Sequence, residues 1–91
     1  MYTTILKFKG KTYSAKLVAM LIVRDNLDLT YDLYVDEPQH IALLVNEDDK
    51  VIHTAHLESW QQDALVEEDK TDEEMAKADE VIDSLRKYWE I

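Results

Sequence analysis

Hydrophobic and polar residues alternate through much of the first two thirds of the chain, which is typical of strands with one buried and one solvated face. The alternation is clearest over residues 27–36, where leucine, tyrosine and valine at odd positions alternate with aspartate, threonine and tyrosine at even positions. Residues 6–9 alternate in the same way between apolar residues and lysines, and Gly10 follows them. A two-residue loop of Gly10 and Lys11 predicts a first hairpin with Phe8 opposite Tyr13.

The apolar stretch over residues 12–24 fits a buried strand or a buried helix equally well by its period. Its β-branched residues and the neighbouring hairpin signals favour a strand, whereas Ser14 could instead cap a short helix. The dipeptide at 25–26 predicts a turn. Pro38 predicts the end of the strand before it, because proline cannot donate to a strand ladder.

Two later apolar runs, over residues 40–45 and 51–57, flank a short polar segment. This pattern predicts a second hairpin with a longer loop. The chain up to this point therefore contains about five predicted strands, which follow one another as a meander.

The last third of the chain has the period of helices. Ser59 with Gln62 predicts a capping box that opens a short helix to about residue 68, and Thr71 with Glu74 predicts a second. Apolar residues recur along the second helix at steps of three and four, at Met75, Ala78, Ile82, Leu85 and Trp89, and Val81 and Tyr88 widen this stripe. We therefore expect one α+β domain over residues 1–91, an antiparallel β-meander of about five strands covered on one face by two C-terminal helices.

Charge divides the chain sharply. The first 24 residues carry five basic side chains and no carboxylate, while the remaining 67 carry twenty acids and five bases, so +5 is followed by −15. The net charge of −10 argues against direct binding of nucleic acid or of an anionic membrane, because both are negatively charged. No apolar run approaches the roughly 20 residues of a membrane-spanning helix. With no cysteine and no signal-peptide pattern, we expect a cytoplasmic protein.

Carboxylates form two candidate partner-binding sets. The larger set lies in the predicted helices and the segment between them and comprises Asp63, Glu67, Glu68, Asp69, Asp72, Glu73, Glu74, Asp79, Glu80 and Asp83. The smaller set lies on the polar face of the strand over residues 27–36 and comprises Asp28, Asp32 and Asp36. An ordered row of carboxylates can imitate the charge spacing of a nucleic acid. The alternative is an ordinary solvated surface, with helical ion pairs from Glu73 to Lys77 and from Asp83 to Lys87.

Other chemistry is weakly represented. His53 and His56 would point to opposite faces of a strand, so we predict no metal site and place them and His40 at the surface or at a sheet edge. The acidic loop over residues 46–50 lacks the length and the glycine of an EF-hand. No nucleophile, phosphate loop or buried acid–base pair is recognisable, so we predict neither catalysis nor a cofactor.

These features suggest a non-catalytic protein that docks its acidic helical face onto a basic protein surface of a nucleic-acid enzyme. Being short, acidic and free of cysteine, the chain resembles in overall character the small inhibitors that phages and mobile elements use against host nucleases, including anti-CRISPR and anti-restriction proteins. That resemblance covers composition and no motif. The alternative is a small housekeeping or regulatory homodimer, joined through the terminal helix or a sheet edge, whose acidity serves solubility.

Overall fold

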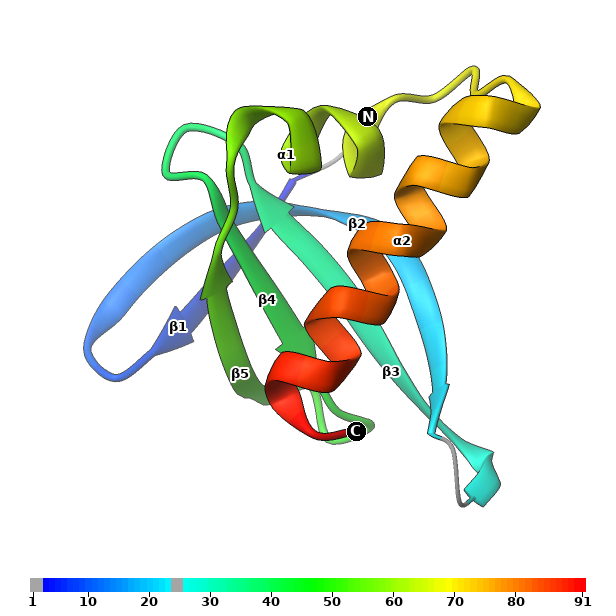
Figure 1. Cartoon of the computed structure of the whole chain (residues 1–91). Helices are drawn as coiled ribbons and strands as arrows, with labels where there is room; N and C mark the ends of the chain where they lie inside the picture. The colour runs from blue at the N-terminus through cyan, green and yellow to red at the C-terminus, as the bar shows by residue number, and fades with distance from the viewer. Residues whose placement is uncertain (1–2, 24–25) are drawn as a thin grey trace.

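Five strands form one antiparallel sheet in the order β1-β2-β3-β4-β5, and two helices follow (Figure 1). The computed structural model describes residues 3–23 and 26–91, with side chains over 3–22 and 29–91. The elements are β1 (Thr4–Phe8), β2 (Lys11–Val23), β3 (Asn26–Asp36), β4 (Ile41–Val45), β5 (Val51–His56), α1 (Ser59–Val66) and α2 (Asp72–Trp89). The predicted α+β meander with two C-terminal helices is confirmed. The turn predicted at 25–26 lies partly outside the described residues.

The hairpin of β1 and β2 turns at Lys9 and Gly10, one residue earlier than predicted. Both residues have positive φ angles, 48° and 79°, as a two-residue type I′ turn requires. Glycine adopts such an angle without a steric penalty because it has no Cβ. The pairing therefore places Leu6, and not Phe8, opposite Tyr13.

The ambiguous stretch over residues 12–24 is a strand wherever it is described, as the hairpin signals favoured. β2 is long because it serves two partners, pairing with β1 over residues 11–15 and with β3 over residues 16–23. A register shift between Leu17 and Ala19 marks a β-bulge, which bends a strand and increases its twist. The resulting sheet curls until β1 contacts β5 (Figure 1).

Two hydrophobic clusters occupy the two faces of the curled sheet. The larger one, beneath the helices, contains Leu21, Leu33, Val35, Ala42, Leu44, Ala55, Leu57, Ala64, Leu65, Val81, Leu85 and Trp89. The smaller one, inside the curl, contains Leu6, Tyr13, Ala15, Leu43 and Val45. Because β4 contributes alternate residues to both clusters, it is buried on both faces, which explains its uninterrupted apolar sequence.

α1 begins one residue away from the predicted capping box. The cap is Glu58, whose N–H donates to Gln61 Oε1 at 2.9 Å. Gln62, predicted to close the box, is buried instead and donates its side-chain amide to the Glu37 carbonyl at 3.2 Å. α1 ends at Val66, about two residues earlier than predicted.

α2 follows the prediction closely. Thr71 Oγ1 accepts the Glu74 N–H at 3.3 Å while Glu74 Oε1 accepts the Thr71 N–H at 3.4 Å, so the second capping box is confirmed. The buried face of α2 is made of Ala78, Val81, Leu85 and Trp89. Met75 and Tyr88 were wrongly included in this face, being 53% and 72% exposed. The first turns of α2 extend beyond the sheet (Figure 1). Consecutive helical residues lie about 100° apart around the axis, so Tyr88 is turned away from the buried Trp89.

Candidate acidic protein-binding surface

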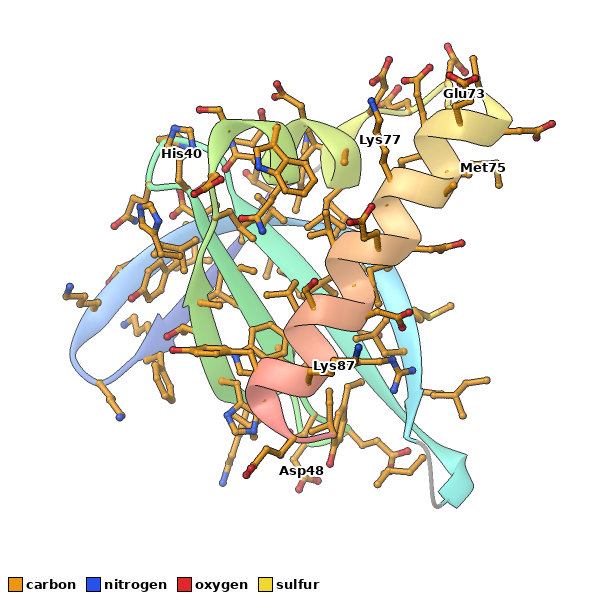
Figure 2. All side chains as sticks on the ribbon, viewed as in Figure 1. His40, Asp48, Glu73, Met75, Lys77 and Lys87 are labelled. Atoms are coloured by element: carbon orange, nitrogen blue, oxygen red, sulfur yellow. The ribbon has the colours of Figure 1, made fainter. Side chains whose placement is uncertain are left out.

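The two helices enclose an acidic hollow of about 650 Å³ at their junction. Its lining residues are Trp60, Asp63, Ala64, Glu67, Glu74, Lys77 and Glu80. Four carboxylates and one ammonium give this hollow a formal charge of −3. The charge is gathered there because the link between the helices is short and places the end of α1 beside the start of α2 (Figure 2).

Within this hollow, Glu67 and Glu74 approach each other closely enough for their carboxyl groups to hydrogen bond. That bond, reinforced by the charge of Glu74, raises the pKa of Glu67. The same bond, together with the hydroxyl and backbone N–H of Thr71, lowers the pKa of Glu74. Glu67 is exposed and Glu74 is half-buried, so the pair reflects crowding of acids at the surface and not full burial of one of them.

A second acidic hollow lies on the adjoining flank of α2. It is lined by Ala76, Asp79, Glu80, Asp83, Ser84 and Lys87. Glu80 lines both hollows, so the negative surface is continuous from α1 across α2. We call the ten carboxylates predicted between Asp63 and Asp83 the acidic helical surface.

The members of the acidic helical surface that line neither hollow surround the link between the helices. These are Glu68, Asp69, Asp72 and Glu73, and all four are exposed. Figure 2 shows Glu73 at the outer tip of α2. The structure thus brings together the larger predicted set of carboxylates.

Basic side chains do not neutralise this surface. In residues 3–22 and 29–91, the ion pair within 4.0 Å is that of Lys16 with Glu37, far from the helical acids in sequence. The pairs predicted from Glu73 to Lys77 and from Asp83 to Lys87 are therefore not formed there. Lys70 donates to the Leu65 carbonyl at 3.3 Å at the end of α1.

The basic side chains of the first strands lie elsewhere. Lys7, Lys9 and Lys11 belong to the β1–β2 hairpin, whose tip is at the opposite end of the molecule from the link between α1 and α2 (Figure 1). These lysines are therefore separated in space from the acidic helical surface, while elsewhere Lys16 pairs with Glu37 and Asp49 lies beside Lys7 and Lys9.

The described members of the smaller predicted set, Asp32 and Asp36 on β3, do not form an acidic face. Asp36 is only 1% exposed, so the prediction that it lies on a solvated face was wrong. Its carboxylate accepts the N–H groups of Ser14 and Gln39, both at 3.1 Å, and the Gln39 side-chain amide at 2.8 Å. The curl of β2 over β3 provides the first of these donors. Asp36 therefore has a structural role, because it ties β2 to the turn that follows β3.

The other described residues of that strand face are half-buried or exposed to different extents. Asp32 is half-buried, and Tyr34 packs beside the cluster inside the curl. Partial burial, with the charges of Asp32 and Asp49, raises the pKa of Tyr34. The side chain of Asp28 lies outside the described residues.

The three histidines are dispersed. His53 stacks on Trp89 with ring centroids 5.9 Å apart, while the Trp89 Nε1–H donates to the Thr54 carbonyl at 3.1 Å. His40 lies in the turn before β4 with a φ of 55°, and His56 is exposed at the end of β5. Among the described residues, no three histidine or carboxylate side chains are grouped to hold a metal ion.

One exposed apolar feature was missed by the sequence analysis. Leu17, Met20 and Ile22 on β2 are 46%, 71% and 50% exposed. The apolar run around them was interpreted as wholly buried, since no polar residue interrupts it to reveal an open face.

No described helix has the length and apolar character needed to cross a membrane. Comparison with family models, curated proteins and solved structures finds no significant match to this chain. The function is therefore inferred from the geometry and charge of the surface itself.

Proposed function

We propose that this protein is a non-catalytic inhibitor whose acidic helical surface occupies a basic, nucleic-acid-binding surface of a larger cytoplasmic protein complex. The observation that carries the proposal is a continuous row of carboxylates across α1 and α2 with no described basic side chain at ion-pair distance. A surface of this kind attracts a basic partner and fixes its orientation.

The spacing of charge along α2 supports mimicry of a nucleic acid. Between Asp72 and Asp83 the helix carries six acids and one base, Lys77, which leaves five net negative charges. At about 1.5 Å per residue this span is roughly 16 Å long, or about one net charge per 3.3 Å. One strand of a duplex carries a charge about every 3.4 Å. A groove adapted to phosphates would therefore meet a similar density of negative charge.

Trp60 supplies an apolar contact at the edge of this surface. Its side chain is 50% exposed, lines the hollow at the helix junction and is oriented by a hydrogen bond from its Nε1 to Glu58 Oε2 at 2.9 Å. Tryptophan is enriched among residues that dominate binding energy, and its ring attracts an arginine side chain. An arginine of the partner can stack on Trp60 and pair with Glu67 or Glu74.

The proposal is tested by measuring binding and inhibition against purified nucleic-acid enzymes. The resemblance to small phage inhibitors makes CRISPR effector complexes and restriction enzymes the first partners to examine. We expect the protein to compete with DNA or RNA for the enzyme, and its affinity to fall steeply as salt is raised. An affinity for a captured enzyme that is indifferent to salt would refute the charge mechanism.

A matched pair of variants separates local charge from total charge. Glu80→Gln with Asp83→Asn removes two carboxylates from the acidic helical surface, and Asp48→Asn with Asp49→Asn removes two exposed ones from the β4–β5 loop. Both double variants have the same net charge, −8. We expect the first to weaken binding at least tenfold and the second to leave it near that of the wild type. Equal losses would show that only total charge matters.

A further inference from the structure

The outer edge of β2 is unpaired beyond its hairpin with β1. β1 covers residues 11–15, and over residues 16–22 no other described strand pairs with that edge. The Arg86 guanidinium donates to the Ile22 carbonyl at 2.7 Å. Because residues two apart in a strand aim their backbone groups to the same side, Met20, like Ile22, directs its N–H and C=O away from β3.

Apart from Arg86 at the Ile22 carbonyl, the side chains along this edge are apolar and offer no protection against pairing. Leu17, Met20 and Ile22 are exposed, while Leu21 between them packs into the larger core cluster. The segment over residues 17–23 contains no charge and no proline. Native sheets commonly guard an open edge with charges, prolines or a covering segment. Between the β-bulge after Leu17 and the Arg86 contact at Ile22, the edge around Met20 carries no such guard and is suited to receive another strand.

The residues of β3 beside this edge favour pairing along the edge over packing of one sheet face on another. Thr30 and Asp32 on β3 pair with Ile22 and Met20 and therefore share their face of the sheet. Packing two such faces together would bury the Asp32 carboxylate, which is costly without a partner. Pairing along the edge leaves Asp32 in water and satisfies the open backbone groups.

We propose that two copies of this chain associate edge to edge through β2, antiparallel about a two-fold axis at Met20. Met20 is the midpoint of the uncharged segment 17–23, so this register gives the longest overlap free of charge. The two Met20 residues bond to each other through their backbones, and the two sheets of five strands become one of ten.

The distribution of charge favours a second copy of this chain as the partner that pairs with the edge of β2. Each chain carries −10, so contact between copies is opposed over most of the surface. The first 24 residues hold no carboxylate, and the edge lies within them. The same strand is self-complementary, because an antiparallel edge can always pair with its own copy about a two-fold axis. This association is independent of the proposed inhibitory function.

Sedimentation of the full chain over about a hundredfold range of concentration tests the dimer. We expect a reversible dimer that Met20→Lys weakens at least tenfold, because a charge at the centre of the edge opposes pairing. Ile5→Lys, at a 61% exposed apolar residue of β1, is the matched control and should leave the dimer intact. A chain that is monomeric throughout, or a dimer weakened equally by both variants, would overturn the inference.

Salt distinguishes this association from the proposed function. Added salt should strengthen the dimer, because it screens repulsion between two negative copies, whereas it should weaken binding to a basic partner. Either proposal can therefore fail while the other stands. A dimer that dissociates as salt is raised would contradict pairing through the uncharged edge.

A cross-link tests the register. The chain has no cysteine, so Met20→Cys introduces a unique thiol. Facing residues of a hydrogen-bonded pair have Cα atoms about 5.5 Å apart, within the disulfide range of about 4.4 to 6.8 Å. Mild oxidation with oxidised glutathione should yield a covalent dimer, and Ile5→Cys should not. Failure of a dimeric Met20→Cys variant to cross-link would exclude the two-fold axis at Met20.

Discussion

Glu67 at the end of α1 and Glu74 in the first turn of α2 lie close enough for the Glu67 carboxyl, when protonated, to donate to the Glu74 carboxylate. The bond raises the pKa of Glu67, so the folded protein holds this proton more tightly than the unfolded chain does. The stabilisation from this proton is present at low pH and is lost as the pH rises through the raised pKa. Glu74 behaves oppositely, because its pKa is lowered, and its contribution is lost as the pH falls.

We predict that Glu67→Gln raises the thermal midpoint at about pH 7, because the amide still donates to Glu74 but carries no charge, and that the gain shrinks near about pH 4. Thermal unfolding followed by circular dichroism at the two pH values measures this. Glu68→Gln, at an exposed acid one residue away, is the control and should change little at either pH. A gain independent of pH would argue against the shared hydrogen bond.

Replacing Asp36 should destabilise the fold. Asp36→Ala leaves the N–H groups of Ser14 and Gln39 without their acceptor, so we expect a loss of about 3 kcal/mol in the free energy of unfolding. Urea denaturation measures it. Asp48→Ala, an exposed acid whose carboxylate accepts no described hydrogen bond, should cost under about 1 kcal/mol. Similar losses for the two variants would contradict the structural role of Asp36.

Replacing the two adjacent aromatic residues at the end of α2 should lower the free energy of unfolding by very different amounts. Trp89 is buried, stacks on His53 and donates to the Thr54 carbonyl, so Trp89→Ala should cost about 3 to 5 kcal/mol. Tyr88 is exposed, and Tyr88→Ala should cost within about 0.5 kcal/mol. Denaturation of the two variants in parallel tests how α2 is oriented on the sheet. A larger cost at Tyr88 would mean that the helix is rotated.

The first hairpin can be stabilised by one substitution. Lys9 occupies the first position of a type I′ turn with a φ of 48°, where asparagine is preferred. Lys9→Asn should raise the free energy of unfolding by about 0.5 kcal/mol. Lys11→Asn, at a paired strand position, removes the same charge and should give no gain. Chemical denaturation compares them, and equal effects would argue against the turn.

Most elements of this fold could be predicted because they have a strong local pattern, such as the Thr71–Glu74 capping box and the alternation along β3, whereas the period of β2 fitted a strand and a helix equally. The first turn was displaced by one residue because glycine suits either position of a two-residue turn, so the local pattern does not decide between Lys9–Gly10 and Gly10–Lys11. Asp36 was placed on the wrong side because its donors come from a strand 22 residues earlier.

The acidic helical surface was foreseeable for a related reason. Its residues are close in sequence, and a capping box fixes the start of the helix that carries most of them. The contact between Glu67 and Glu74 depended on the geometry of the link and could not be predicted. The open edge of β2 arises from the unequal lengths of β1 and β2, a tertiary property that neither strand reveals alone.

The separation of the β1–β2 hairpin lysines from the helical acids gives the molecule a permanent electric dipole moment along its length. In the field of a cationic target, such a moment exerts a torque before any atoms touch. The molecule would arrive already turned, with its helices leading and its hairpin trailing into solvent. Reversing the lysines of that hairpin to glutamates would then slow capture by shrinking the moment, although none of them meets the target.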